Sequence, residues 1–270
     1  MMRVNGQSWG CVSAGDRGLA YGDGVFRTML IHNKKILQWS RHYAKLAVDC
    51  AQLGIQCPPE SLFWDDIMEL ARTEPDAVVK LIVTRGEGQR GYAPPNNVMP
   101  NRVVLTSRVP VYPATFREQG VTIRLCELRL SHQPRLAGIK HLNRLEYVLA
   151  RAEWQDKHIA EGVLLDQREY LVGGTMTNIL LARGNALYTP LLEGNGVAGV
   201  TRARLLVIAD ELGMHTSVER LTVDDLLTAD EVMLCNSVIG VWPVRNWGRH
   251  RWQLGPITTQ LCSLLEREDG

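Results

Sequence analysis

The chain has 270 residues, of which 45% are hydrophobic and 22% are charged. This length and composition indicate a globular protein with one large domain or two modest ones. The formal net charge of +1 gives no support for binding to nucleic acid or to an anionic membrane surface. No apolar run is long enough to span a bilayer, and the N-terminus lacks the apolar core of a signal peptide. The six cysteines are scattered without a C-x-x-C pair, which favours reduced thiols in a cytoplasmic protein, and no residues have metal-ligand spacing.

The first half of the sequence predicts short strands and two helices. Asn5-Gly6 is a typical turn between two short strands. Residues 15–24 are rich in Gly and Asp and predict a loop. Apolar residues recur at helical spacing over 41–53, and Gly54 is a favourable stop for that helix. Further strands are predicted at 25–32, 35–38, 78–84 and 102–109, and a second helix at 60–72.

Residues 111–120 are predicted to link a small N-terminal α/β domain, residues 1–110, to a larger C-terminal domain, residues 121–270. Pro110 and Pro113 flank the start of this linker. The second half predicts strands at 121–127, 162–166, 170–172, 176–182, 186–188, 215–219, 231–235 and 238–244, and helices at 140–158, 201–212, 223–227 and 256–267. Because strands and helices do not alternate as regular βαβ units, the fold class is expected to be α+β.

Lys140 is the most informative single residue. It lies between Ile139 and Leu142, two residues after Gly138, where a loop is expected to enter a helix. Burial disfavours a charged ammonium, and a neutral lysine amine is a nucleophile toward aldehydes. The simpler interpretation is a lysine at a helix start whose ammonium reaches water, and the residue alone does not decide between the two.

Two stretches offer hydrogen-bond donors for an anion. Residues 196–201 place glycines and the hydroxyl of Thr201 at the start of a predicted helix, where exposed N–H groups and the helix dipole favour a phosphate. Asn236 and Ser237 follow an apolar strand and supply a second set of donors. Each stretch is equally readable as an ordinary turn.

Two other stretches have more than one interpretation. The passage Gly173-Gly174-Thr175-Met176-Thr177-Asn178 requires a close approach of the backbone to a ligand or to another strand. Arg85 and Arg90, with Tyr92, lie in a predicted loop where guanidinium groups could bind carboxylates in a fork geometry. The alternative interpretation is that both arginines are solvated residues of a loop and bind no ligand.

Together these motifs resemble the fold-type IV pyridoxal-phosphate enzymes, which include branched-chain and D-amino acid aminotransferases. The resemblance covers essentially the whole chain. It rests on five motifs in the family's order: Gly22-Asp23-Gly24-Val25-Phe26, Arg85-Gly86-x-Gly-x-Arg90-Gly91-Tyr92, Gly138-Ile139-Lys140-His141-Leu142-Asn143-Arg144, Gly173-Gly174-Thr175-Met176-Thr177-Asn178 and Gly199-Val200-Thr201-Arg202.

The resemblance implies a two-domain α+β fold with pyridoxal 5'-phosphate bound between the domains. Lys140, carried by the C-terminal domain, would hold the cofactor covalently and then move protons. It also implies a homodimer acting on a small molecule, with no nucleic-acid or membrane partner and no metal. The cofactor-binding residues would be Lys45, Lys140, Gly173, Gly199, Val200, Thr201, Asn236 and Ser237. The substrate-binding residues would be Thr28, Arg90, Tyr92, Thr175 and Met176.

Two positions depart from the family pattern. Lys45 stands where the family usually has an arginine that binds the cofactor phosphate. A lysine can pair with phosphate, but as a point charge and without a bidentate fork. Gly173 stands where the family has a glutamate that pairs with the pyridine nitrogen and keeps the ring cationic, which makes it an electron sink.

Within the family, the form Lys-His-Leu-Asn-Arg-Leu-Glu, joined to Leu-Ala-Gly-Ile upstream, resembles the bacterial aminodeoxychorismate lyase branch. This implies a cytoplasmic lyase that forms 4-aminobenzoate and pyruvate from 4-amino-4-deoxychorismate for folate synthesis. Two alternatives stay open. One is an aminotransferase for D- or branched-chain amino acids, and the other is a degenerate protein that binds the cofactor with little activity.

Overall fold

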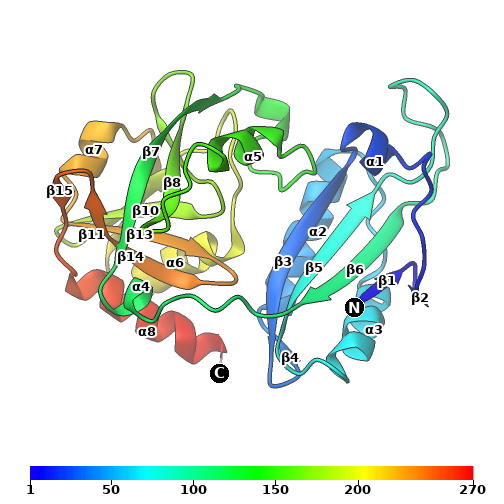
Figure 1. Ribbon diagram of the computed structural model, residues 1–270, viewed down its shortest axis with the longest axis horizontal. Coiled ribbons are helices and arrows are strands. Elements are labelled where there is room, and N and C mark those ends of the chain that lie inside the picture. Colours follow the sequence, from blue (N-terminus) through cyan, green and yellow to red (C-terminus); the bar gives the residue numbers. More distant parts are fainter. Residues whose placement is uncertain (270) are drawn as a thin grey trace. The chain divides into compact units, whose positions relative to one another are not determined.

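The computed structural model describes residues 1–269, and their contacts divide the chain into two compact units (Figure 1). Unit 1 contains Met1–Pro110 together with Ile139–Asn143, and unit 2 contains Val111–Gly138 and the chain from Arg144 onward. The sequence prediction assigned Lys140 to the C-terminal domain. By its contacts, the short segment that carries this lysine is instead part of unit 1.

Among the described residues, unit 1 has a six-stranded antiparallel sheet covered on one face by two helices. Alternate residues of one strand, Val25, Met29 and Ile31, pack with Leu46 and Phe63 of the helices, as the period of a strand requires. The sheet order is β2-β1-β6-β5-β3-β4. The elements are β1 (Met2–Val4), β2 (Gln7–Ser8), β3 (Gly24–His32), β4 (Lys35–Ile36), α2 (Trp39–Gln52), α3 (Glu60–Ala71), β5 (Ala77–Thr84) and β6 (Asn101–Ser107).

The loop predicted at residues 15–24 contains a short helix, α1 (Arg17–Tyr21). The Asp16 carboxylate accepts hydrogen bonds from the N–H groups of Gly18 and Leu19, which caps the first turn. Gly22 ends the helix with φ of 65°, a left-handed conformation that suits glycine. The prediction of a loop was wrong because five residues are too few to show helical periodicity.

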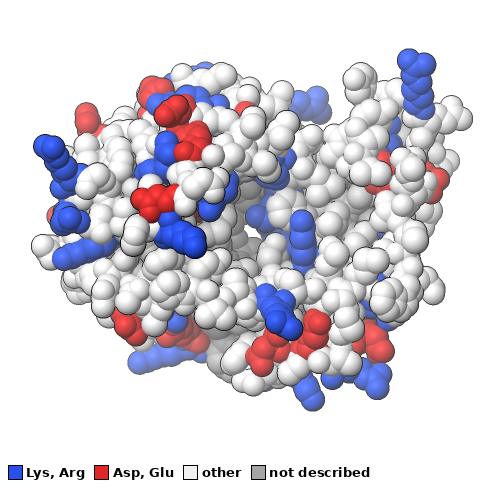
Figure 2. All heavy atoms as spheres, viewed as in Figure 1, with Lys and Arg blue, Asp and Glu red and all other residues white. Residues whose placement is uncertain are grey.

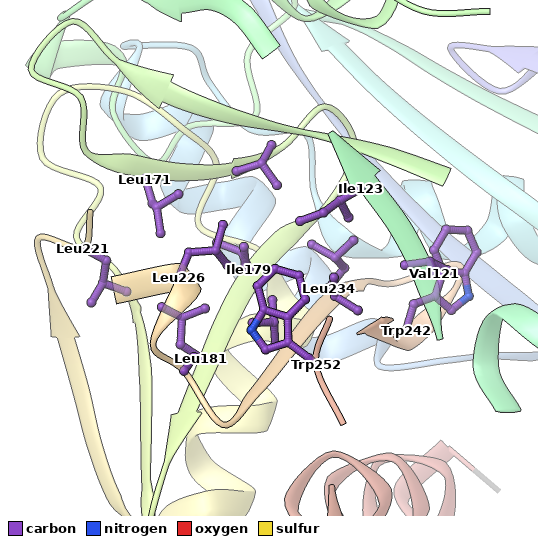
Figure 3. Packing of buried hydrophobic residues seen from close by; sticks show 14 of the residues in the cluster. Val121, Ile123, Leu171, Ile179, Leu181, Leu221, Leu226, Leu234, Trp242 and Trp252 are labelled. Carbon is purple, nitrogen blue, oxygen red and sulfur yellow. The ribbon is translucent and has the colours of Figure 1, made fainter. Parts of the chain in front are cut away.

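Unit 2 contains, within the described residues, a nine-stranded mixed sheet with apolar packing on both faces. Along β10 and β13, alternate residues pack into two different cores, which explains why both strands read as continuous apolar runs. Figure 3 shows one core, where Leu181 and Leu234 lie with Trp252. The strands are β7 (Val121–Leu130), β8 (Ile159–Asp166), β9 (Leu171–Gly174), β10 (Asn178–Arg183), β11 (Ala186–Pro190), β12 (His215–Glu219), β13 (Glu231–Asn236), β14 (Gly240–Trp247) and β15 (His250–Arg251).

The helices of unit 2 are α4 (Thr115–Glu118), the 3-10 turn η1 (Pro134–Leu136), α5 (Leu145–Arg151), α6 (Val200–Glu211), α7 (Val223–Leu227) and α8 (Pro256–Asp269). Among them, α5 is shorter than the sequence predicted, α6, α7 and α8 are close to prediction, and α4 and η1 were not predicted. Within the described residues, no helix is both long enough and apolar enough to cross a membrane.

The stretch predicted as a linker packs against unit 2. It contains α4, and the rings of Tyr112 and Phe116 lie with their centroids 4.8 Å and 5.2 Å from that of Trp242. Edge-on aromatic contacts of this kind hold the stretch to the sheet. Pro110 nevertheless marks the end of the first continuous segment of unit 1.

The helix predicted at residues 140–158 is confined to α5, and Lys140 lies before it in a strand-like segment. The N–H of Phe26 donates to the carbonyl of Lys140 at 2.9 Å, and the N–H of Leu142 donates to the carbonyl of Gly24 at 2.9 Å. The prediction was wrong because Ile139 and Leu142 are spaced like one face of a helix, whereas pairing with β3 decides the conformation.

Candidate active site

Lys140 is fixed through its backbone to two elements of unit 1. Its carbonyl accepts from β3, as described above, and its N–H donates to the carboxylate of Asp49 on α2 at 3.2 Å. The side-chain amine lies over the ring of Phe26, 4.6 Å from the ring centroid. The aromatic face attracts a cationic amine. A primary amine is therefore held on a well-anchored segment, as a lysine that forms a covalent bond with an aldehyde requires.

Lys45, one turn before Asp49 on α2, forms an ion pair with the carboxylate of Asp49. Its side chain is 22% exposed, whereas that of Asp49 is fully buried. Burial and, next, the charge of Arg27 lower the pKa of Lys45 to about 7. Sequence reasoning missed Asp49. A signal for it exists in the sequence, since this acid lies between Leu46 and Cys50 on the apolar face of a helix.

The beginning of α6 in unit 2 presents donors for an anion. The hydroxyls of Thr201 and Ser237 lie 3.0 Å apart, so the first turn of α6 and the turn after β13 meet there. A Cβ at Gly199 would overlap the side chain of Asn178, which itself donates to the carbonyl of Val197 at 2.8 Å. The structure thus brings the hydroxyls of Thr201 and Ser237 together at the positive end of a 12-residue helix.

Asn236 shapes the turn that presents Ser237. Its Oδ1 accepts hydrogen bonds from the N–H groups of Val238 at 2.8 Å and Ile239 at 2.9 Å. Its Nδ2 donates to the carbonyl of Met176 at 3.1 Å. The side chain predicted to bind an anion is therefore engaged in a local turn.

Glu161 on β8 is a second buried carboxylate that sequence reasoning missed. It is fully buried and accepts hydrogen bonds from the backbone N–H groups of Gly162, Thr175 and Met176. The hydroxyls of Thr175 and Thr177 also donate to it. Burial raises its pKa, while these donors act in the opposite direction. Its signal in the sequence is a charged residue inside an otherwise apolar strand.

The loop after β9 is fixed by Glu161. A Cβ on Gly174 would lie 2.7 Å from Glu161 Oε2, so only glycine leaves room for that carboxylate. Gly173 precedes it, and a Cβ there would lie 2.9 Å from the carbonyl oxygen of Thr177. The predicted substrate contacts Thr175 and Met176 donate to Glu161 through their backbone, and the Met176 side chain is 42% exposed.

The remaining predicted substrate contacts lie in unit 1. Thr28 is half-buried on β3, opposite Lys80 of β5. Arg90 and Tyr92 are exposed in the loop between β5 and β6. The ring of Tyr92 lies 5.4 Å from that of Tyr21, centroid to centroid. This loop could present a guanidinium to a carboxylate-bearing substrate.

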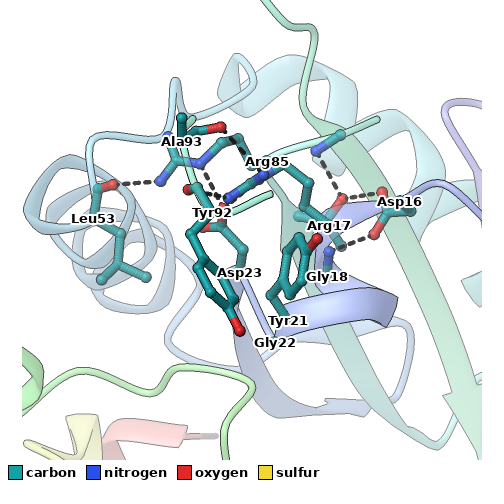
Figure 4. A network of polar contacts seen from close by, with 12 residues as sticks. Asp16, Arg17, Gly18, Tyr21, Gly22, Asp23, Leu53, Arg85, Tyr92 and Ala93 are labelled. Carbon is teal, nitrogen blue, oxygen red and sulfur yellow. Dashed lines mark hydrogen bonds and ion pairs between the residues drawn. The ribbon is translucent and has the colours of Figure 1, made fainter. Parts of the chain in front are cut away.

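Arg85 has a structural role in place of the carboxylate-binding role considered for it. It donates to the carboxylate of Asp23 at 2.8 Å and to the carbonyls of Leu53 and Gly54 at the end of α2 (Figure 4). Arg17 shares the same oxygen of Asp23 at 2.9 Å and donates to the carbonyl of Tyr92. One carboxylate therefore links α1, the end of α2 and the loop that carries Tyr92.

The donor sets fit pyridoxal 5'-phosphate at its aldehyde and at its phosphate. Lys140 supplies an amine for the aldehyde, and Thr201, Ser237 and the start of α6 supply hydroxyl and N–H donors suited to a phosphate. Position 173 supplies no carboxylate for the ring nitrogen, and the oxygens of Glu161 are occupied by the donors of its own loop.

On the face shown in Figure 2, acidic and basic side chains are interspersed over much of the surface. This distribution agrees with the net charge of +1.

Comparison with known proteins gives consistent matches. A family model described as amino-transferase class IV matches residues 24–247. An aminodeoxychorismate lyase of Vibrio harveyi is 36% identical over 244 residues, 90% of this chain and 90% of that protein. A putative branched-chain-amino-acid aminotransferase of Methanocaldococcus jannaschii is 31% identical over 257 residues, 93% of this chain and 88% of that protein. The crystal structure of 4-amino-4-deoxychorismate lyase from Pseudomonas aeruginosa has a TM-score of 0.95 and 43% identity, covering 99% of this chain and 98% of that chain.

The network around Asp23 predicts a pH-dependent contribution to stability. Burial by itself raises the pKa of Asp23, but hydrogen bonds from Arg85 and Arg17 outweigh it and lower that pKa. A lowered folded-state pKa gives stability that is present above the unfolded-state pKa of about 3.9 and is lost as pH falls through the folded-state value. We expect Asp23→Asn to reduce the free energy of unfolding by about 1.5–3 kcal/mol at pH 7.

Urea unfolding of both proteins between pH 7 and pH 3 measures this effect. The difference in the free energy of unfolding between Asp23→Asn and the unaltered protein should shrink as pH falls below about 4. Glu169→Gln is the control, since it removes an exposed partner of Arg129 and should change stability little. A deficit that is as large at pH 3 as at pH 7 would contradict the account given for Asp23.

Proposed function

The chain belongs to the amino-transferase class IV family, and on that premise we propose that it is a pyridoxal-phosphate-dependent lyase that converts 4-amino-4-deoxychorismate to 4-aminobenzoate and pyruvate. The observation that carries the proposal is the similarity to the Pseudomonas aeruginosa lyase along 99% of this chain. The similarity to the Vibrio harveyi lyase supports it independently of the structure.

Lys140 is the proposed catalytic residue. Bound pyridoxal phosphate supplies an electron sink for the carbon that carries the substrate amine. Lys140 would hold the cofactor through its amine, and that amine, when displaced by the substrate amine, would act as the general base at that carbon. Departure of the enolpyruvyl group from the neighbouring carbon leaves an aromatic product, so the substrate contributes to the driving force. The anchoring of Lys140 by β3 and α2 keeps this base in one position.

The proposed phosphate ligands are Thr201, Ser237 and the N–H groups at Gly199 and Val200, with Lys45 as the cation. The hydroxyl pair and the helix N-terminus support this assignment. Asn236 is proposed to act by shaping the turn that carries Ser237.

The proposed substrate contacts are Thr28, Arg90, Tyr92, Thr175 and Met176. Arg90 is the group suited to the carboxylates of 4-amino-4-deoxychorismate, because a guanidinium binds a carboxylate through two hydrogen bonds.

A lyase suits position 173 better than an aminotransferase does. A glycine there leaves the ring nitrogen without the carboxylate of the family pattern, and Glu161 is engaged in its own loop. The ring is then a weaker electron sink. Formation of an aromatic product lowers the demand on the sink, whereas transfer of an amine between ordinary amino acids has no such help.

We also propose that the chain works as a homodimer. On α5, Leu145, Val148 and Leu149 share one face of the helix and are 69%, 60% and 55% exposed. Adjacent exposed apolar side chains of this size mark an interaction surface. A cytoplasmic location and a role in folate synthesis complete the proposal. They are supported by the free state of the six cysteines and by the lyase relatives, and cell fractionation tests the location.

The cofactor and its lysine can be tested directly. Adding pyridoxal 5'-phosphate and then borohydride should fix one cofactor on the Lys140 peptide, as found by mass spectrometry. Lys140→Met should not form this adduct. Its rate of 4-aminobenzoate release should fall by at least about 1000-fold, because the substitution removes both the covalent anchor and the base. Lys80→Met is the control, because Lys80 also lies over the Phe26 ring, at 5.0 Å, but has no proposed role. Adduct formation without product release would favour a degenerate cofactor-binding protein.

The consequence of Gly173 can be measured by restoring an acid. Gly173→Glu should raise the rate at which an amino acid donor alone converts the bound cofactor to its amine form, by about 10-fold over Gly173→Ala, because a carboxylate there would keep a proton on the ring nitrogen. The alanine variant is the matched control for crowding against the carbonyl of Thr177. A fast amine-forming reaction in the unaltered protein would instead favour the aminotransferase alternative.

The dimer can be tested at α5. Leu149→Asp should shift the mass measured by light scattering from that of two chains to that of one, because a buried unpaired charge is costly at an apolar interface. Val111→Asp is the control, since Val111 is 97% exposed and lies outside α5. A single-chain mass for the unaltered protein at micromolar concentration would sink the dimer proposal.

A further inference from the structure

Asp49 is the centre of a charge cluster in unit 1 that the proposed mechanism does not yet use. Its side chain is fully buried on α2, and one oxygen, Oδ2, contacts the guanidinium of Arg27 on β3 and the N–H of Lys140. The other oxygen, Oδ1, contacts the ammonium of Lys45. A single carboxylate therefore joins a strand, a helix and the segment of the proposed catalytic lysine.

Two cations, Arg27 and Lys45, contact the one carboxylate of Asp49. Arg27 is 2% exposed and cannot reach a ligand, whereas Lys45 is 22% exposed. Because partly buried charge favours a counter-charge, the exposed end of the cluster is suited to an anion.

A lysine in this position needs a nearby carboxylate to stay charged, whereas an arginine would not. An ammonium on a flexible four-carbon stem loses its proton when it is desolvated, whereas a guanidinium stays charged. Burial and the nearby Arg27 lower the pKa of Lys45 to about 7, and a carboxylate in contact with the ammonium opposes that loss. Asp49 also restricts the direction of the lysine side chain from one helical turn away.

We propose that Asp49 is a positioning residue that holds Lys45 as the phosphate-binding cation while it fixes the backbone of Lys140. This proposal rests on the proposed function, because the phosphate is that of pyridoxal 5'-phosphate. Asp49 touches neither substrate nor cofactor in this scheme and acts only through its two lysine partners and Arg27.

The experiment compares pyridoxal 5'-phosphate with pyridoxal, which lacks the phosphate, in titrations of the apoprotein followed by absorbance. Asp49→Asn retains an acceptor for the N–H of Lys140 but no charge for Lys45. We expect it to weaken pyridoxal 5'-phosphate binding by about 10-fold and to change pyridoxal binding by less than about 3-fold. Asp66→Asn is the matched control, because Asp66 is a buried carboxylate of the same unit paired with Arg3 and Arg102. It should change neither affinity.

A second variant separates positioning from folding. Lys45→Met leaves the pair between Arg27 and Asp49 in place and should show the same selective loss. The double variant should be no weaker than Lys45→Met alone, because Asp49 acts on the phosphate only through Lys45. Additive losses, or an equal effect on pyridoxal and pyridoxal 5'-phosphate, would overturn the proposal and leave Asp49 as a structural ion pair.

An apoprotein measurement distinguishes failure of this proposal from failure of the proposed function. Acetylation of Lys45 at pH 6, mapped by mass spectrometry, should rise about fivefold in Asp49→Asn, since the loss of the carboxylate favours the neutral amine. If the unaltered protein binds no pyridoxal 5'-phosphate, the proposed function fails and the phosphate role fails with it. If binding occurs but the labelling of Lys45 is unchanged in Asp49→Asn, only the role of Asp49 is wrong.

Discussion

The cost of burying a carboxylate governs the backbone near the candidate residues of each unit. Asp49 in unit 1 and Glu161 in unit 2 are each fully buried. A carboxylate remains in such a position only when donors or cations surround it. Asp49 accepts a hydrogen bond from the N–H of Lys140, and Glu161 accepts hydrogen bonds from the N–H groups of Thr175 and Met176. Each acid therefore fixes a piece of main chain that carries proposed function.

The two acids differ in the charge that surrounds them, and this difference divides their roles. The partners of Glu161 are neutral N–H and hydroxyl groups, and its pKa is raised by burial. These donors occupy both oxygens of Glu161, so the carboxylate orders its own loop and does not offer an acceptor to a ligand. Asp49 contacts two cations, Arg27 and Lys45, and Lys45 is the more exposed of the two. We therefore propose anion binding near Asp49 and at the start of α6, while Glu161 anchors its own loop.

Local sequence patterns were sufficient to predict most strands and helices, because periodicity and turn residues are local signals. They also singled out Lys140, Thr201 and Ser237 as candidate site residues through motifs. They failed for α1, which is too short for periodicity, and for the conformation at Lys140, where pairing with β3 prevails. The partners of Asp49 could not be predicted, because the bond to Lys140 spans 91 positions in the chain and no periodic pattern reports such a contact.

The two departures from the family pattern have unequal consequences, and this inequality is the physical case for a lyase. The loss of the arginine at position 45 is offset within unit 1, because Asp49 helps Lys45 to keep its charge. The loss of the glutamate at position 173 has no comparable remedy, since Glu161 is consumed by its own loop. In the proposed function, the chain binds the phosphate but provides a weaker electron sink, which suits a reaction whose product supplies its own stabilisation. Formation of an aromatic ring does so, whereas exchange of an amine between two similar acids does not.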